Sequence, residues 1–169
     1  MKTLTSRLFL AFLFLLLCSA ASPGGQSSAD AGVPKGWKRV DAGGFFTFYL
    51  PPHAWDTGFS GTDEFYREYR VGKMRLMFVH RPMSVLAYDK REQQFGRGFQ
   101  ERVVELAGRR AYLFDYVQNE KGRKRYYTDL YVGDFPRGEV KLWMQADSWR
   151  PADLEIAKRI FRTVEFLRP

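Results

Sequence analysis

The chain has 169 residues, a formal net charge of +8 and a hydrophobic content of 45%. That length suits one domain with its own core, and so much apolar sequence excludes an intrinsically disordered chain. Aromatic residues make up 17% of the chain, which favours a sheet-rich fold. The chain has a single cysteine, Cys18, and this excludes an intramolecular disulfide.

The first 21 residues are typical of a signal peptide. Lys2 and Arg7 flank the start of an apolar run, Leu8–Leu17, and small residues follow at Ser19–Ala21. The run is too short to cross a bilayer, which takes about 20 residues. We therefore predict export to the periplasm or out of the cell, with cleavage at the end of the small-residue segment.

Cys18 leaves a second destination open, because a cysteine directly after such an apolar run can be a lipid-attachment site. Lipoprotein signals place a small residue before this cysteine, whereas Leu17 stands here. Residues 22–35 are rich in Gly, Ser and Pro, and we predict a flexible linker that would suit a tether. Anchoring to the membrane through Cys18 is therefore the alternative to ordinary secretion.

Residues 36–169 are predicted to form a single domain made mainly of strands. Pro51 and Pro52 must end an aromatic strand, because proline has no N–H for the ladder. Alternation of apolar and polar residues predicts the strands in chain order: residues 45–50, 64–71, 73–80, about 101–106, 110–118, 123–132 and 139–146. A short strand precedes them, before a turn at Gly43–Gly44. The segment Ser84–Gly98 is predicted to be a helix or a loop that crosses over.

The chain closes on a predicted amphipathic helix. Ser148 is the expected N-cap, and Pro151 lies in the first turn, where its missing N–H costs nothing. The apolar residues that recur at helical spacing are Leu154, Ala157, Ile160, Phe161 and Val164. Thr163–Phe166 is predicted to add a last short strand. The helix should therefore pack on the sheet through its apolar stripe.

Two segments of this chain resemble the PsbP-like α/β/α sandwich superfamily. They are GGFFTFYLPPHAW (residues 43–55), similar to the family's aromatic strand that ends in proline, and ADLEIAKRIFRTVEF (residues 152–166), similar to its closing helix and strand. The family includes the extrinsic lumenal subunit of photosystem II, a nuclear Ran-binding protein and many small exported bacterial proteins of unknown role. The resemblance covers residues 36–167 and rests on no catalytic motif.

The resemblance implies an α+β fold, an α/β/α sandwich around a mostly antiparallel sheet with the C-terminal amphipathic helix packed on the sheet. It also implies a protein that binds partners and has no common enzymatic activity. No functional residue carries over, because the family has no shared site motif. Bulky residues on both faces of the central strands agree with a layered fold.

Candidate catalytic and metal-binding residues are sparse. His53 and His80 are far apart in the sequence, and neither stands in the spacing of a metal site. His80 ends an apolar strand face, so we interpret it as a packed residue. No GxSxG segment marks a nucleophile, and no glycine-rich segment has the spacing of a phosphate loop. We predict no cofactor, no metal and no enzymatic activity, with a small hydrolase as the remote alternative.

Asp115 and Asp129 stand in adjacent predicted strands and must be weighed as a catalytic pair. Asn119–Gly122 has the pattern of a three-residue hairpin loop with a bulge at the glycine. That register places both aspartates on one face with Arg125 within reach of each. We interpret the trio as charge pairing. A two-residue loop would put the aspartates on opposite faces and also exclude the pair.

The same hairpin carries a candidate anion-binding tip formed by Lys121, Arg123 and Lys124. Alternation sends Lys124 and Arg125 to opposite sides of the ribbon, so the cations do not form one patch. The sequence predicts an exported, non-catalytic binding or envelope-associated module whose partner is an unknown protein or envelope component. The alternative is a protein that binds a polyanion, such as wall polymer, anionic lipid or nucleic acid, through this tip, although no specific nucleic-acid motif is present. The oligomeric state is open.

Overall fold

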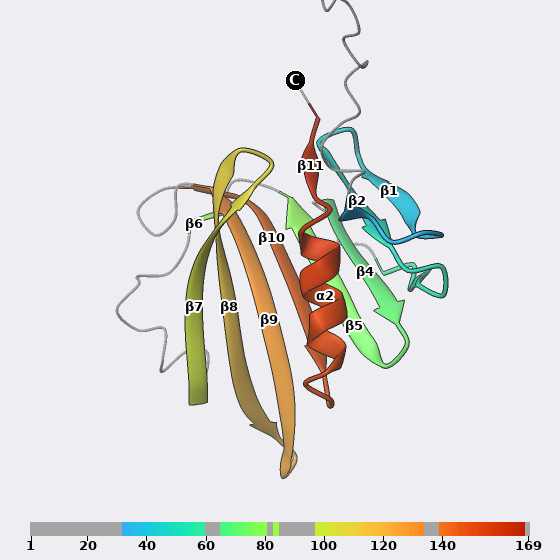
Figure 1. Ribbon diagram of the computed structural model, residues 1–169. Coiled ribbons are helices and arrows are strands. Elements are labelled where there is room, and N and C mark those ends of the chain that lie inside the picture. The colour runs from blue at the N-terminus through green and yellow to red at the C-terminus, as the bar shows by residue number, and fades with distance from the viewer. Residues whose placement is uncertain (1–31, 60–64, 81–82, 85–96, 134–138, 168–169) are drawn as a thin grey trace, which may run out of the picture. The chain divides into compact units, whose positions relative to one another are not determined.

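The computed structural model describes residues 32–59, 65–80, 83–84, 97–133 and 139–167 (Figure 1). The predicted signal peptide with Cys18, most of the predicted linker and residues 85–96 of the predicted crossover lie outside these residues. Residues 32–169 form one compact unit. No helix in the described part of the chain is long and apolar enough to span a membrane.

Two antiparallel sheets make up most of this unit (Figure 1). The small sheet has the order β1 (Lys38–Ala42), β2 (Phe46–Leu50), β11 (Glu165–Phe166). The large sheet has the order β3 (Trp55–Asp56), β4 (Phe65–Val71), β5 (Met74–His80), β10 (Glu139–Ser148), β9 (Arg123–Gly133), β8 (Arg109–Glu120), β7 (Arg97–Leu106), and β6 (Met83–Ser84) also pairs with β10. The predicted strands are confirmed as β1, β2, β4, β5, β7, β8, β9, β10 and β11, whereas β3 was not predicted. Three residues of the predicted crossover are strand residues instead, Ser84 in β6 and Arg97 and Gly98 in β7. The fold is α+β with sheet predominating.

One helix, α2 (Asp153–Phe161), packs on the large sheet over β5, β9 and β10 and also contacts β2 (Figure 1). We call the sheet face toward α2 the inner face and the opposite one the outer face. All five residues of the predicted apolar stripe are buried, so the predicted packing of the C-terminal helix on the sheet is confirmed. Between β2 and β5, Phe46 meets Phe78 edge to face at 5.2 Å between ring centroids.

The predicted N-cap of this helix is wrong. Ser148 belongs to β10, and the helix begins at Asp153 with Ala152 in the N-cap position. The Ser148 hydroxyl instead donates a hydrogen bond to the Asp153 carboxylate at 2.6 Å. The strand runs farther than its apolar pattern indicates, because Asp147 and Ser148 pair with strand β9.

The predicted register of the β8–β9 hairpin is also wrong. Glu120 pairs with Arg123, so Lys121 and Gly122 form a two-residue loop. Both have positive φ, 50° and 77°, as a type I′ turn requires, and this turn matches the twist of the strands. The pattern of asparagine and glycine permits either loop, and the lysine accepts the left-handed conformation. Every side chain on one strand therefore changes its opposite partner.

Candidate functional site: the outer face and basic end of the large sheet

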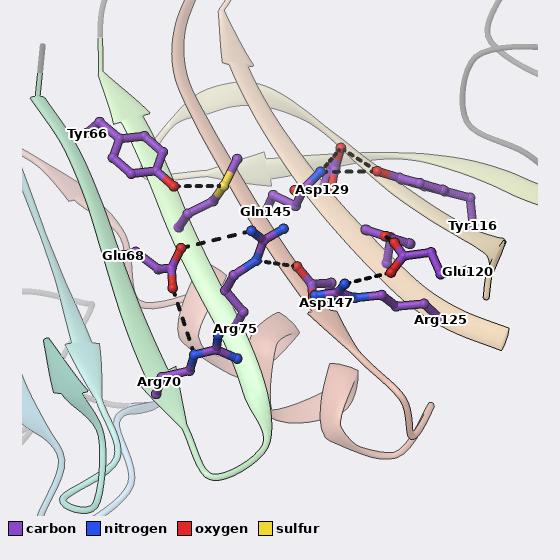
Figure 2. A network of polar contacts seen from close by, with 12 residues as sticks. Tyr66, Glu68, Arg70, Arg75, Tyr116, Glu120, Arg125, Asp129, Gln145 and Asp147 are labelled. Carbon is purple, nitrogen blue, oxygen red and sulfur yellow. Dashed lines mark hydrogen bonds and ion pairs between the residues drawn. The ribbon is translucent and has the colours of Figure 1, made fainter. Parts of the chain in front are cut away.

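Asp147 is the centre of an ion-pair network on the outer face (Figure 2). It is 2% exposed and lies on β10 between strands β5 and β9. Its Oδ1 accepts a hydrogen bond from Arg75 Nε at 2.7 Å, and its Oδ2 accepts one from Arg125 Nε at 2.8 Å. Arg75 lies near Glu68, with 3.9 Å between Nη1 and Oε2. A buried carboxylate thus binds two guanidinium groups at once, one at each of its oxygens.

Arg125 continues the network to strand β8. Its Nη1 donates to Glu120 Oε2 at 2.7 Å, and Glu120 also accepts a hydrogen bond from the Tyr127 hydroxyl. Burial alone would lower the pKa of Arg125, but the hydrogen bonds to Glu120 and Asp147 outweigh it and raise that pKa. The hydrogen bonds from Tyr127 and Arg125 lower the pKa of Glu120. Arg125 therefore stays charged and held in place.

Asp129 lies farther along the same face among tyrosines. It is 0% exposed, and its Oδ2 accepts hydrogen bonds from Tyr116 Oη at 3.3 Å and Gln145 Nε2 at 3.4 Å (Figure 2). Oδ2 also accepts one from Tyr131 Oη at 3.5 Å. Burial raises the pKa of Asp129 to about 7, although the hydrogen bond from Gln145 acts in the opposite direction. This carboxyl group is therefore poised to titrate near neutral pH.

Three chain segments bring cations to one end of the large sheet. Asp147 pairs with Arg75 on one side and Tyr127 on the other, so the β4–β5 turn, the β8–β9 turn and the end of β10 lie at the same end of the sheet (Figure 1). We call this the basic end, and its exposed cations are Lys73, Lys121, Arg123, Lys124 and Arg150. Arg150 pairs with Asp153 at 2.6 Å. Within the described residues, the other four form no ion pair.

Trp149 lies among these cations at the end of β10 and is 36% exposed. The guanidinium carbon of Arg123 lies 4.7 Å from the centroid of its ring, and that of Arg125 lies 5.3 Å from it. Such contacts place a cation over an aromatic face. Asp147 holds Arg125 in place, and Arg125 in turn packs on the indole ring of Trp149. The basic end is a cationic surface with a half-covered tryptophan.

The three residues of the predicted anion-binding tip all lie at the basic end. Lys121 is in the turn, Arg123 is on the outer side against Trp149, and the pairing of Lys124 with Asn119 puts it on the inner side. Arg123 and Lys124 thus lie on opposite sides of the ribbon, although both stand at the same end of the sheet. From outside the hairpin, the structure adds Trp149 against Arg123.

The predicted trio of Asp115, Asp129 and Arg125 is wrong. Asp115 pairs with Thr128, so it lies on the inner face, opposite to Asp129. There Asp115 forms ion pairs with Arg102 and with Lys158, whose Nζ is 3.0 Å from Oδ2. Arg125 turns to Glu120 and Asp147 instead, as described above. The reason is the two-residue turn, which moves each side chain by one position relative to the expected register.

The two histidines do not form a site with each other. His53 is exposed. The ring of His80 packs against Phe45 and Phe46, with centroid separations of 4.4 Å and 5.6 Å, and burial lowers its pKa. The interpretation of His80 as a packed residue is thereby supported. Among the residues that the structure describes, no three metal-ligating side chains gather to hold an ion.

Sequence reasoning missed Asp147 and Trp149, the two residues that organise the site. Alternation with Leu142, Met144 and Ala146 puts Asp147 on the face opposite to the core, where an aspartate is expected to be exposed. The sequence therefore carries no signal of its burial or of its arginine partners. The identity of the neighbours was hidden, because β10 lies between β5 and β9, which are distant in the sequence.

No family model matches the chain, and no curated protein matches it significantly. Among solved structures, a protein from Bacteroides thetaiotaomicron VPI-5482 has a TM-score of 0.54 and 12% identity, over 78% of this chain and 48% of that one. The chain thus spans about half the length of that protein. At this identity the likeness concerns the fold alone.

Two other solved structures match more distantly. LpqN, involved in cell envelope biogenesis of Mycobacterium tuberculosis, has a TM-score of 0.39 and 16% identity, over 80% of this chain and 81% of its own. PA94 of Pseudomonas aeruginosa, a protein of unknown function and putative regulator by its description, has a TM-score of 0.38 and 16% identity, over 72% of this chain and 88% of its own. At these scores neither structure supports an inference about this chain.

Proposed function

We propose that this protein is an exported, non-catalytic binding module that docks on an anionic lipid surface through its basic end. The observation that carries the proposal is the position of Trp149 among exposed cations, under the guanidinium of Arg123. Membrane interfaces favour tryptophan, and anionic headgroups attract lysine and arginine. The proposal joins the envelope-associated module and the polyanion-binding alternative that the sequence leaves open.

The charge balance at the basic end supports an anionic partner. The acidic residues nearest to it, Asp147, Glu120 and Asp153, are each taken up by an arginine. Lys73, Lys121, Arg123 and Lys124 are exposed and without an ion pair in the described part of the chain. Each cation near an anionic membrane contributes about 1 kcal/mol to binding. Four such residues on two segments, the β4–β5 turn and the β8–β9 hairpin, give a membrane-sized partner several points of attachment.

Vesicle binding tests the proposal. The protein should sediment with vesicles of phosphatidylglycerol mixed with phosphatidylcholine and much less with phosphatidylcholine alone. Arg123→Gln and Lys121→Gln should each weaken binding about fivefold, because each removes one cation from the basic end. Lys38→Gln and Arg110→Gln remove exposed cations elsewhere and should change binding far less. Equal losses from all four variants would reject the basic end as the contact surface.

Two tryptophan variants test whether binding depends on this surface or only on the positive charge of the protein. Trp149→Ala should weaken vesicle binding. Trp55→Ala should not, although Trp55 is 57% exposed, because it lies on the edge strand β3, separated from β9 by β4, β5 and β10. A larger loss from Trp55→Ala would place the contact elsewhere. Equal affinity for duplex DNA and for the anionic vesicles would contradict a lipid surface as the partner.

Export is part of the proposal and has its own test. Intact-mass analysis of the protein from its native cell should give an N-terminus at Ala21 or Ser22, as the pattern of small residues predicts. A diacylglyceryl group on Cys18 would replace ordinary secretion by a lipid anchor. An uncleaved leader on the native protein would contradict both forms of the proposal.

Membership of the PsbP-like superfamily also remains a proposal. Two features support it: the aromatic strand β2 ends directly before Pro51, and α2 leads into β11, which pairs with β2. These are the two segments on which the resemblance rests. An α/β/α sandwich needs helices on both sides of the sheet, and α2 is the one α-helix in the residues that the structure describes. The sandwich is therefore proposed on the resemblance.

A further inference from the structure

A pocket opens on the inner face, away from the basic end, between α2 and strands β7, β8 and β9. Its volume is about 240 Å³. Val104, Leu113 and Leu130 line it from the strands, and Phe161 lines it from the helix. An apolar cavity of about 150 Å³ holds a benzene molecule. This pocket therefore has room for an apolar group larger than one aromatic ring.

Cations border this apolar floor. Arg102, Lys158 and Arg162 all line the pocket, against one acidic lining residue, Glu105. Asp115 holds two of them, since its Oδ2 accepts from Arg102 and lies 3.0 Å from Lys158 Nζ. Arg102 is bonded to Asp115 through Nη2, so other N–H groups of this guanidinium are left to donate.

Arg162 provides the charge that is not taken up. It follows α2 directly and is exposed, and it forms no ion pair with any residue in the described ranges. An arginine beside an apolar pocket recognises a carboxylate by charge-assisted hydrogen bonds, while the pocket takes the apolar part of the same molecule. Each half of the site thus selects one half of an amphiphile.

We propose that this pocket binds a monocarboxylate with a medium-length acyl chain, with the chain against Val104, Leu113 and Phe161 and the carboxylate at Arg162 and Arg102. The site is separate from the basic end, so the module would carry a small ligand and a surface contact at once. Binding here needs no contact with a membrane, and its failure would leave the vesicle experiment unaffected.

Titration of the protein with octanoate, followed by calorimetry and by NMR of the valine and leucine methyl groups, tests the site. We expect a dissociation constant below about 1 mM for this small ligand, with shifts at Val104 and Leu113. Arg162→Gln should weaken octanoate about tenfold, the effect of losing one charged hydrogen-bond partner. Octanol has the chain without the charge. It should bind to the native protein no more tightly than octanoate binds to the Arg162→Gln variant.

Two matched controls keep the test specific. Val104→Phe fills the pocket and should abolish binding. Val103 is on the same strand but faces the other side of the sheet and is 53% exposed, so Val103→Phe should leave binding unchanged. Arg159→Gln removes the same charge from α2 on the side where Arg159 lies over Trp37, and should also leave it unchanged. No octanoate binding, equal binding of octanol, or equal effects of Val103→Phe and Val104→Phe would overturn the proposal.

Discussion

Raising the pH from about 3 to about 8 should remove about 4 kcal/mol from the free energy of unfolding through Asp129 alone. Its pKa is about 7 in the folded protein against the usual 3.8, so in this range the folded state binds more protons than the unfolded state. The contribution is fully present below the lower value and is lost as the pH passes the higher one. Urea denaturation at a series of pH values measures it.

Asp129→Asn isolates this contribution. The amide oxygen can still accept from Tyr116 and Gln145, but it carries no proton to lose, so the difference in stability between variant and native protein should grow in favour of the variant as the pH rises. Thr128→Val is the matched control, because Thr128 is its buried neighbour on the inner face and does not titrate. A difference that stays constant with pH for Asp129→Asn would contradict a raised pKa.

Asp147→Asn should lower the free energy of unfolding by about 3 kcal/mol, the lower end of the range for breaking a buried ion pair. The carboxylate is 2% exposed, while its partners Arg75 and Arg125 are 29% and 21% exposed. Part of the cost is therefore relieved by water around the guanidinium groups. Urea denaturation at neutral pH gives the value directly.

Asp56→Asn is the control for this second prediction. Asp56 and Arg67 form an exposed pair at 3.9 Å, and such pairs contribute about 0–1 kcal/mol. The double variant Asp147→Asn, Arg75→Gln should lose less free energy of unfolding than the two single variants added together, because Asp147 and Arg75 are partners. Equal destabilisation by Asp147→Asn and Asp56→Asn would mean that the network contributes no more than a surface pair.

Strands and the closing helix could be predicted because their signals are local. Proline ends β2, Gly72 separates β4 from β5, and the stripe of α2 has a helical period. The register of β8 and β9 could not, since it depends on whether Lys121 takes a positive φ. That single conformation decides which face Asp115 occupies, and therefore whether it can lie beside Asp129 and Arg125.

The candidate site depended on pairing between distant strands. Lys121, Arg123 and Lys124 were visible as a cluster in the sequence, but Trp149 and Lys73 join them only because β5, β10 and β9 are neighbours in the sheet. Asp147 illustrates the same limit: alternation gives only its face, whereas its burial and its partners Arg75 and Arg125 follow from the strand order.

Arg125 connects the ion-pair network to the basic end. Asp147 holds Arg125, and Arg125 lies over Trp149 together with Arg123. Ordered side chains lose less conformational entropy when they bind. Loss of Asp147 should therefore weaken binding as well as stability, although no contact with the partner is removed.

The most direct test of the central claim is the salt dependence of binding to phosphatidylglycerol vesicles. If the exposed cations of the basic end attach the protein, the affinity should fall at least tenfold as the ionic strength rises from about 0.05 to about 0.5 M, because salt screens charges at the surface. The Lys121→Gln, Arg123→Gln double variant should show a shallower dependence. An affinity that does not change with salt, or the same dependence in the double variant, would contradict the claim.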